Sequence, residues 1–160
     1  MLIFETKNFI ITTSEKPEVS REDGGQVDIC EKHGIEDRLM LSPKAELELA
    51  YLTHVVAQAF ITVMRKNGVP VERLNYQDNG NWCYIENKKP HQHLHIYGRV
   101  FASKKQPLPM SLYFPHPNDD FYKDNKPLTE KDIKDIRSEI ERLMQTERYN
   151  KTIWHLENLK

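Results

Sequence analysis

Three histidines alternate with other residues in the stretch His91-Gln92-His93-Leu94-His95-Ile96, and no other feature of the chain constrains its fold as strongly. Successive side chains of a β-strand point to opposite faces, so the three imidazoles share one face while Leu94 and Ile96 occupy the other. The apolar face needs a covering layer, whereas the imidazole face stays open to a ligand. The motif therefore predicts a sheet with one packed face and one functional face.

Several other segments predict short strands, because they are rich in β-branched residues or alternate apolar with polar ones. These segments are residues 2–4, 9–13, 26–30, 38–41, 73–77, 92–101 and 111–114. The sequence Asp78-Asn79-Gly80-Asn81 is typical of a turn. No repeat or long linker divides the chain, so a single domain over residues 1–160 is expected.

Two amphipathic helices complete the predicted fold. The pair Ser42-Pro43 is a typical helix start, and an apolar stripe with spacings of three and four follows it. Thr129 and Asp132 predict a capping box at the start of a second helix, within a C-terminal helical segment of about residues 129–160. Strands followed by capped helices predict an α+β fold.

The charge balance limits the classes of partner. Acidic and basic residues nearly cancel, 24 against 23, which gives a formal net charge of −1. Proteins that follow the phosphates of a duplex usually carry a basic excess, so we expect no duplex nucleic acid as a partner. A small phosphorylated ligand remains compatible with this composition, because it needs only a local pocket.

The compartment is predicted from the N-terminus and the cysteines. Glu5 and Lys7 interrupt the place where a secretory signal needs apolar residues, and polar residues interrupt the longest apolar-rich stretch, residues 51–64. We therefore expect neither a signal peptide nor a membrane span. Cys30 and Cys83 are too few for a disulfide scaffold and indicate free thiols in a reducing cytoplasm.

The histidine face admits three interpretations. The histidines are solvent-side residues of a strand, or two of them bind a metal with ligands from elsewhere, or one of them attacks a phosphate. At about 3.3 Å per residue, His91 and His95 lie roughly 13 Å apart, too far for all three to share one zinc at roughly 2.0 Å. A neutral imidazole is a competent nucleophile, and flanking imidazoles suit a ligand whose charge is spread over several phosphates.

The motif from His91 to Tyr97 resembles the signature of the histidine triad (HIT) superfamily, in which three histidines alternate with hydrophobic residues. The segment from Gly24 to His33 is similar to a strand and corner of that family, and the segment from Asn75 to Gly80 to its polar segment before the triad. The likeness covers residues 2–97 and, more loosely, the remainder. It implies an antiparallel sheet of about five strands with two main helices packed on one face.

The chain departs from the family pattern at several positions. Gln92 stands where the family has a hydrophobic residue, Gln26 replaces a histidine and Glu31 replaces a proline. The family's Ser, Thr or Gln shortly before the triad, which contacts phosphate, has no equivalent here. Lys88 and Lys89 occupy that neighbourhood, and we expect one of them to contact phosphate in its place.

The resemblance also implies roles for single residues. His93 matches the nucleophile, which attacks phosphorus to give a nucleotidyl-histidine intermediate that water then cleaves. His91 and His95 match the flanking members, which orient the nucleophile and neutralise phosphate oxygens. His33 matches a fourth histidine of the phosphate pocket, and Asn75 matches a polar residue that orients the substrate. The resemblance implies no metal and no cofactor.

A nucleotide hydrolase or transferase acting at an α-phosphate is therefore the function expected from sequence. The implied substrates are nucleoside phosphoramidates, dinucleoside polyphosphates or adenylated small molecules, and the base preference stays open. Two alternatives remain: a nucleotide-binding regulatory module with incidental turnover, and a zinc-dependent hydrolase.

A homodimer is the expected assembly. The first helix carries apolar residues on more than one face, beyond what one sheet needs to bury: Leu47, Leu49, Tyr51, Leu52, Val63 and Met64. The resemblance implies pairing through this helix and the neighbouring strand at residues 73–77, whose edge would otherwise be open. The alternative is a monomer in which C-terminal residues fold back over that surface, namely Ile153, Trp154, Leu156 and Leu159.

Overall fold

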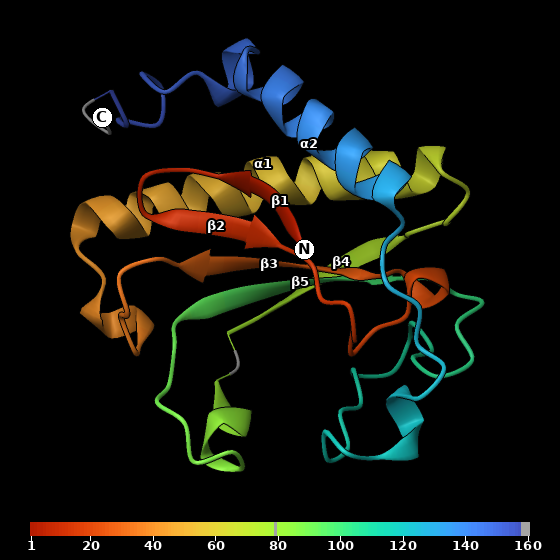
Figure 1. The fold of residues 1–160 in the computed structure, drawn as a ribbon. Coiled ribbons are helices and arrows are strands. Elements are labelled where there is room, and N and C mark those ends of the chain that lie inside the picture. The colour runs from red at the N-terminus through yellow and green to blue at the C-terminus, as the bar shows by residue number, and fades with distance from the viewer. Residues whose placement is uncertain (79, 158–160) are drawn as a thin grey trace.

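The structure, a computed structural model, describes residues 1–78 and 80–157 of the chain. A five-stranded antiparallel sheet lies at its centre, with the strands in the order β1-β2-β3-β5-β4 (Figure 1). In chain order the strands are β1 (Leu2–Glu5), β2 (Phe9–Thr12), β3 (Gln26–Glu31), β4 (Arg73–Gln77) and β5 (His93–Arg99). The predicted α+β class and antiparallel sheet are confirmed.

The two faces of the sheet differ because apolar and polar residues alternate along β3 and β5. Val27 lies opposite Ile96, and Ile29 lies opposite Leu94, and all four side chains are buried in the apolar core. The intervening positions carry the histidines and their polar neighbours. One face of the sheet therefore packs in the apolar core, and the other face presents polar and titratable side chains.

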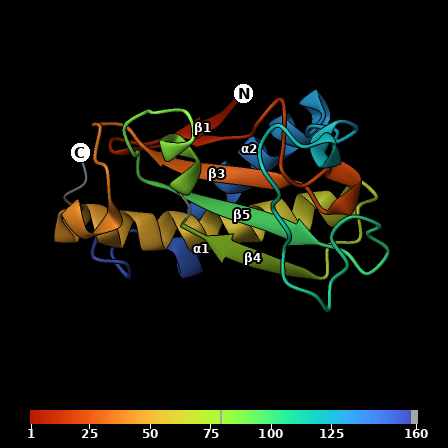
Figure 2. The ribbon, with the colours of Figure 1, turned by 90° about the horizontal axis from the view of Figure 1, so that it is seen from below.

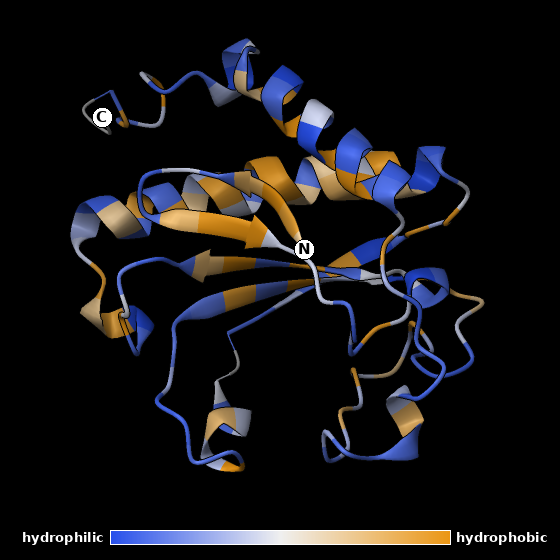
Figure 3. Cartoon of the chain, viewed as in Figure 1, coloured by the Kyte–Doolittle hydropathy of each residue, from blue (hydrophilic) through white to orange (hydrophobic). Residues whose placement is uncertain are grey.

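Helix α1 (Pro43–Lys66) covers the apolar face. In Figure 2, which is seen from below, the strands lie in front of this helix. The Ser42 hydroxyl accepts a hydrogen bond from the Ala45 N–H at 3.2 Å, and Pro43 holds the first helical position, as the sequence predicts. Figure 3 shows that α1 is largely apolar, whereas the loops beneath the sheet are largely hydrophilic. Its fully buried residues include Leu49, Leu52, Val55, Val56, Ala59, Phe60 and Met64.

Helix α1 is also long and apolar enough to cross a membrane, judged by length and composition alone. Composition alone therefore does not exclude a span here, contrary to the sequence-based reasoning. More than half of its most apolar window is buried inside the protein, which is the behaviour of the core helix of a globular domain.

Helix α2 (Glu130–Met144) packs on α1 on the side away from the sheet's open face (Figure 1). The predicted capping box is confirmed, since Thr129 and Asp132 each bond the other's main-chain N–H. Burial opposes ionisation of Asp132, but hydrogen bonds from Arg21 and Thr129 outweigh it and hold the pKa of Asp132 well below its usual range. Beyond Met144 only a short 3-10 helix, Glu147–Tyr149, follows within the described residues, so the helical segment is shorter than predicted.

Three strand predictions need correction. Residues 38–41 form a 3-10 helix, Arg38–Met40, because the Asp37 side chain accepts the Leu39 N–H and favours a turn. Residues 111–114 form no strand, because the Gln106 side chain bonds both the N–H and the carbonyl of Tyr113. The long candidate at residues 92–101 is a strand only over His93–Arg99. Asn79, within the predicted turn, and Leu159 lie outside the described residues.

Candidate active site

The triad lies where β3 and β5 pair. His95 lies opposite Asp28, and His93 lies opposite Cys30, so their side chains share the open face. His91 precedes β5 and continues the same row, with its ring stacked 6.1 Å from that of His93. The prediction that the three histidines share one face is therefore confirmed, for His93 and His95 by the register of the sheet and for His91 by its ring contact and its place in the same cavity.

The tautomer of His93 follows from its hydrogen bond. Its Nδ1 lies 2.6 Å from the main-chain carbonyl oxygen of His91, which can only accept. Nδ1 therefore carries the proton, and Nε2 keeps its lone pair. Burial, and next the neighbouring His95, lower the pKa of His93 below its ordinary value. Both effects favour the neutral imidazole that a nucleophile requires.

His95 has the opposite tendency. Its Nδ1 lies 2.6 Å from Oδ1 of Asp28, and both residues are 8% exposed. Burial disfavours the imidazolium, but the hydrogen bond and charge of Asp28 outweigh burial and raise the pKa of His95. The two rings meet edge to face with their centroids 4.5 Å apart. The pKa values of the two adjacent imidazoles are therefore shifted in opposite directions, which favours the neutral form of His93 and the protonated form of His95.

The remaining groups on this row have supporting roles. His91 Nε2 lies 2.6 Å from the carbonyl oxygen of Glu31, so this nitrogen donates and the ring is held at the end of β3. Burial, with the nearby charge of Asp28, raises the pKa of the Cys30 thiol to about 11. Cys30 is therefore a thiol near neutral pH and not a nucleophile.

Two loops enclose the histidine face in a cavity of about 540 Å³. One connects β4 to β5, and the other spans residues 100–128 between β5 and α2; Figure 2 shows them over opposite ends of the strands. Trp82 of the first loop meets Tyr122 of the second edge to face, with centroids 6.0 Å apart. The cavity is lined by His91, His93, His95, Tyr97, Glu18, Gln77, Gly80, Asn81, Trp82, Cys83, Glu86, Lys88, Lys89, Phe114 and Pro117.

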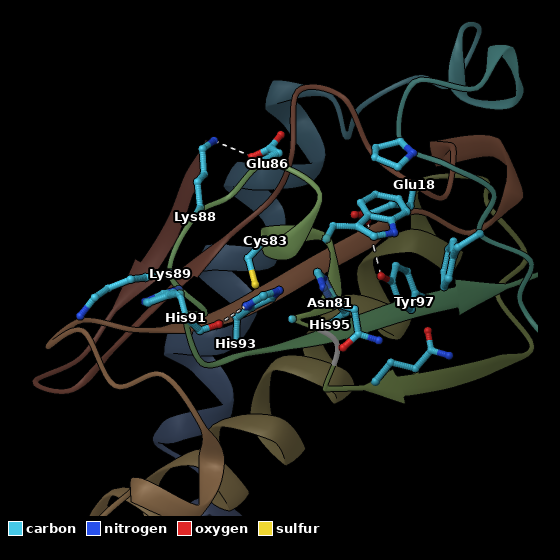
Figure 4. A pocket seen from close by; sticks show the side chains of 15 residues that line it. Glu18, Asn81, Cys83, Glu86, Lys88, Lys89, His91, His93, His95 and Tyr97 are labelled. Atoms are coloured by element: carbon cyan, nitrogen blue, oxygen red, sulfur yellow. Dashed lines mark hydrogen bonds and ion pairs between the residues drawn. The ribbon is translucent and has the colours of Figure 1, made fainter.

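Both predicted lysines line this cavity (Figure 4). Lys88 Nζ lies 2.6 Å from a carboxylate oxygen of Glu86, and Lys89 Nζ lies 3.2 Å from one of Glu36. Their side chains are 70% and 87% exposed. Exposed ion pairs of this kind contribute little energy, so a phosphate can displace either carboxylate at small cost.

The structure does not bring His33 or Asn75 to the cavity. Glu31 accepts the N–H of both His33 and Ile35, which turns the chain after β3 and leaves His33 exposed. Asn75 shares the open face but binds Arg99, whose guanidinium donates to its Oδ1 at 2.6 Å. The expected roles of His33 in a phosphate pocket and of Asn75 in orienting substrate are therefore not supported by the geometry.

Arg99 is a structural residue that the sequence does not single out. It is 2% exposed, and besides Asn75 it donates to the carbonyls of Pro107 and Met110. Arg99 thus ties the loop at residues 100–128 to the end of β5. This anchoring fixes one wall of the cavity.

Sequence reasoning also missed Asp28, Glu18 and the aromatic lining. Asp28 alternates with Val27 and Ile29, which the sequence shows, but only the register of β3 against β5 shows that Asp28 meets His95.

The buried Gln92 donates a hydrogen bond to Asp78 at 3.0 Å. This departure from the family pattern therefore ties the start of β5 to the start of the first loop.

Comparison with solved structures identifies the fold as that of histidine triad proteins. The chain is similar to a hypothetical histidine triad nucleotide-binding protein from Sulfolobus tokodaii, with a TM-score of 0.57 and 17% identity over 90% of this chain and 85% of that one. A histidine triad protein from Bradyrhizobium japonicum gives a TM-score of 0.59 and 12% identity over 89% and 88% of the two chains. A Zn-bound histidine triad family protein from Mycobacterium smegmatis gives 0.56 and 19% over 89% and 84%.

No family model and no curated protein sequence matches the chain. The resemblance predicted from the triad is confirmed at the level of the fold.

Proposed function

We propose that the protein is a nucleotide hydrolase or transferase that acts at an α-phosphate through a covalent intermediate on His93. One observation carries this proposal: the His91 carbonyl fixes the Nδ1 proton of His93 and leaves its Nε2 lone pair for attack within the cavity. The description of the Sulfolobus neighbour as nucleotide-binding supports a nucleotide as the ligand.

The reaction has two steps. Nε2 of His93 forms a bond to the α-phosphorus, and the bond from phosphorus to the leaving group breaks, its electron pair going to the leaving group, which takes up a proton. Protonated His95, backed by Asp28, stabilises the charge on the non-bridging oxygens. Water, or another acceptor in a transferase, then attacks phosphorus, losing a proton, and releases the nucleotide and free His93.

Two features of the site support the substrate class that the triad resemblance implies. Nucleoside phosphoramidates and dinucleoside polyphosphates both place an α-phosphate between a nucleoside and a leaving group, and adenylated small molecules do the same. Lys88 and Lys89 at one end of the cavity favour a leaving group with negative charge, and we assign to one of them the phosphate contact. The alternative, a regulatory module, would bind a nucleotide in the same cavity and hydrolyse it only slowly.

Trapping of the intermediate tests the proposal. The purified protein is quenched in acid-free denaturant during turnover of a nucleoside phosphoramidate, and the peptide that carries His91 to His95 is analysed by mass spectrometry. We expect a nucleoside-monophosphate adduct on this peptide, and none in His93→Ala. Rapid turnover without any adduct in rapid-quench experiments would contradict the mechanism.

We also propose a cytoplasmic homodimer. Its interface would use the open edge of β4, where Tyr76 is 49% exposed beside a groove of about 530 Å³. Residues of α1 and β4 line this groove together with Glu72, Arg148 and Tyr149. The apolar start of α1 gives less support than the sequence indicates, because Trp154 packs on Tyr51 and Leu156 is 3% exposed, which covers part of that surface. Light scattering should give twice the 18.9 kDa chain mass; a mass of one chain at high concentration would contradict the dimer.

A further inference from the structure

The end of the cavity beyond His95 combines aromatic rings with a carboxylate. Tyr97 follows His95 on the same face, and its ring lies 5.2 Å from that of Phe114 between centroids. Trp82, held edge-on by Tyr122, and Glu18 from the β2–β3 connection complete this end. Three aromatic rings therefore line this end of the cavity, together with a carboxylate.

Glu18 is held in place through its main chain. Its N–H donates to Oε1 of Gln26 at 2.7 Å, and its carbonyl accepts from Nδ2 of Asn125 at 3.0 Å. Among the described residues, no cationic side chain pairs with its carboxylate, whose hydrogen bond from the Tyr97 hydroxyl is long, at 3.5 Å. A half-buried carboxylate in this setting gains from a ligand that donates hydrogen bonds to it.

The two ends of the cavity differ in their charged groups, and His93 lies between them (Figure 4): one end has two lysines in exposed ion pairs, and the other has a carboxylate without a salt bridge to any residue that the structure describes. Lys88 and Lys89 lie toward the His91 end, and Glu18 lies at the Tyr97 end. A leaving group with negative charge is attracted by the lysines and repelled by Glu18. With the α-phosphorus at His93, the nucleoside occupies the Glu18 end, where its base can stack on the aromatic rings.

We propose that Glu18 selects guanine at this end of the cavity, an inference that rests on the proposed nucleotide chemistry. Guanine presents two adjacent donors, N1–H and the 2-amino group, to the two oxygens of one carboxylate. Adenine and cytosine each present an amino group beside an acceptor nitrogen, whose lone pair would face a carboxylate oxygen. Uracil presents one N–H between two carbonyls, so it makes a single bond and two repulsive contacts.

The test compares kcat/KM for guanosine and adenosine 5′-phosphoramidates with the same leaving group. Wild type should favour guanosine by about fivefold or more, because a bidentate contact to a base typically discriminates by at least this factor. In Glu18→Gln the preference should vanish or reverse, since an amide offers one donor and one acceptor, which suits adenine. Glu15→Gln is the matched control, because Glu15 is an exposed carboxylate of the same segment and does not line the cavity.

A second variant separates stacking from base selection. Trp82→Ala should lower kcat/KM for both nucleotides by a similar factor, because stacking on an aromatic ring tolerates any base. Equal kcat/KM for the two nucleotides in wild type, or an unchanged ratio in Glu18→Gln, would overturn the role of Glu18 while leaving the hydrolase intact. Absence of turnover with both nucleotides would overturn the proposed function instead, and calorimetry with GMP and AMP would then decide the base preference by itself.

Discussion

The two faces of the central sheet are ordered by different forces. On the helix face, Leu94 and Ile96 are buried in the apolar core that α1 covers, and burial of this kind stabilises the fold without directional contacts. On the open face, His93 and His95 are fixed by single hydrogen bonds, to a carbonyl and to Asp28. Alternation along one strand therefore separates stability from chemistry residue by residue, and neighbouring positions can be tested against each other.

The sharpest test of this separation compares His93→Ala with Leu94→Ala. His93→Ala should lower kcat/KM at least about 1000-fold, some 4 kcal/mol of barrier, because alanine cannot form the covalent intermediate. Its free energy of unfolding should change by less than about 1 kcal/mol, since the ring is only half-buried. Leu94→Ala should cost about 2–4 kcal/mol of unfolding free energy through the cavity it creates.

Urea denaturation and initial rates, measured on the same preparations, check both halves of this prediction. The folded fraction of Leu94→Ala should keep kcat within a few-fold of wild type. More than a tenth of wild-type activity in His93→Ala would remove it from the role of nucleophile. An unchanged free energy of unfolding in Leu94→Ala would show that apolar packing on the helix face does not stabilise β5.

The sequence predicts the helix face better than the open face, for a physical reason. Apolar periodicity and helix caps are local signals. The sequence therefore predicts both helices, and the structure confirms their N-caps at Ser42 and Thr129. The histidine row is local as well. The partner of His95 is not, because it depends on the register of β3 against β5, and several registers keep the same apolar face inside.

The loops show the same limit. Residues 111–114 read as a strand by composition, but Gln106 takes the hydrogen bonds of Tyr113 that a strand partner would need. The wall formed by Phe114 and the position of Glu18 depend on such side-chain contacts between distant segments. His33 was expected in the site by resemblance, and its exposed position reflects a turn that Glu31 stabilises in this chain.

Removal of the Asp28 charge should give the next largest effect. Asp28→Asn keeps the size of the side chain but takes away the charge that raises the pKa of His95, so burial will lower this pKa. Less His95 is then protonated near neutral pH, and kcat/KM should fall about tenfold or more. Asp124→Asn, an exposed carboxylate of the second loop, is the matched control.

The pH profile distinguishes this role from simple structural support. The lowered pKa of His93 places the acid limb of kcat/KM below 6.5, and the raised pKa of His95 places the alkaline limb above it. In Asp28→Asn the alkaline limb should move to lower pH. An alkaline limb that stays in place, with only the plateau reduced, would mean that Asp28 orients the ring and does not set its charge. Because the rings are neighbours, the limbs report apparent pKa values of the coupled set.

The smallest expected effect is that of metal removal, and it tests whether the open face works by imidazole chemistry alone. Within residues 1–78 and 80–157, no three His, Cys, Asp or Glu side chains are grouped so that they could hold one ion. One nitrogen of each triad ring is already committed, to the carbonyls of Glu31 and His91 and to Asp28. The other nitrogen of each ring keeps its lone pair, but three rings spaced along one strand face cannot all reach one zinc at roughly 2.0 Å, so a zinc site would need ligands from elsewhere. Dialysis against EDTA should therefore change kcat/KM by less than about twofold. Magnesium is added back as a control for ions bound by the substrate's own phosphates.

Metal content is measured in parallel, because one of the proteins similar in fold is Zn-bound. One zinc per chain, with activity that is lost when zinc is removed and restored when zinc is added, would make this protein a zinc-dependent hydrolase.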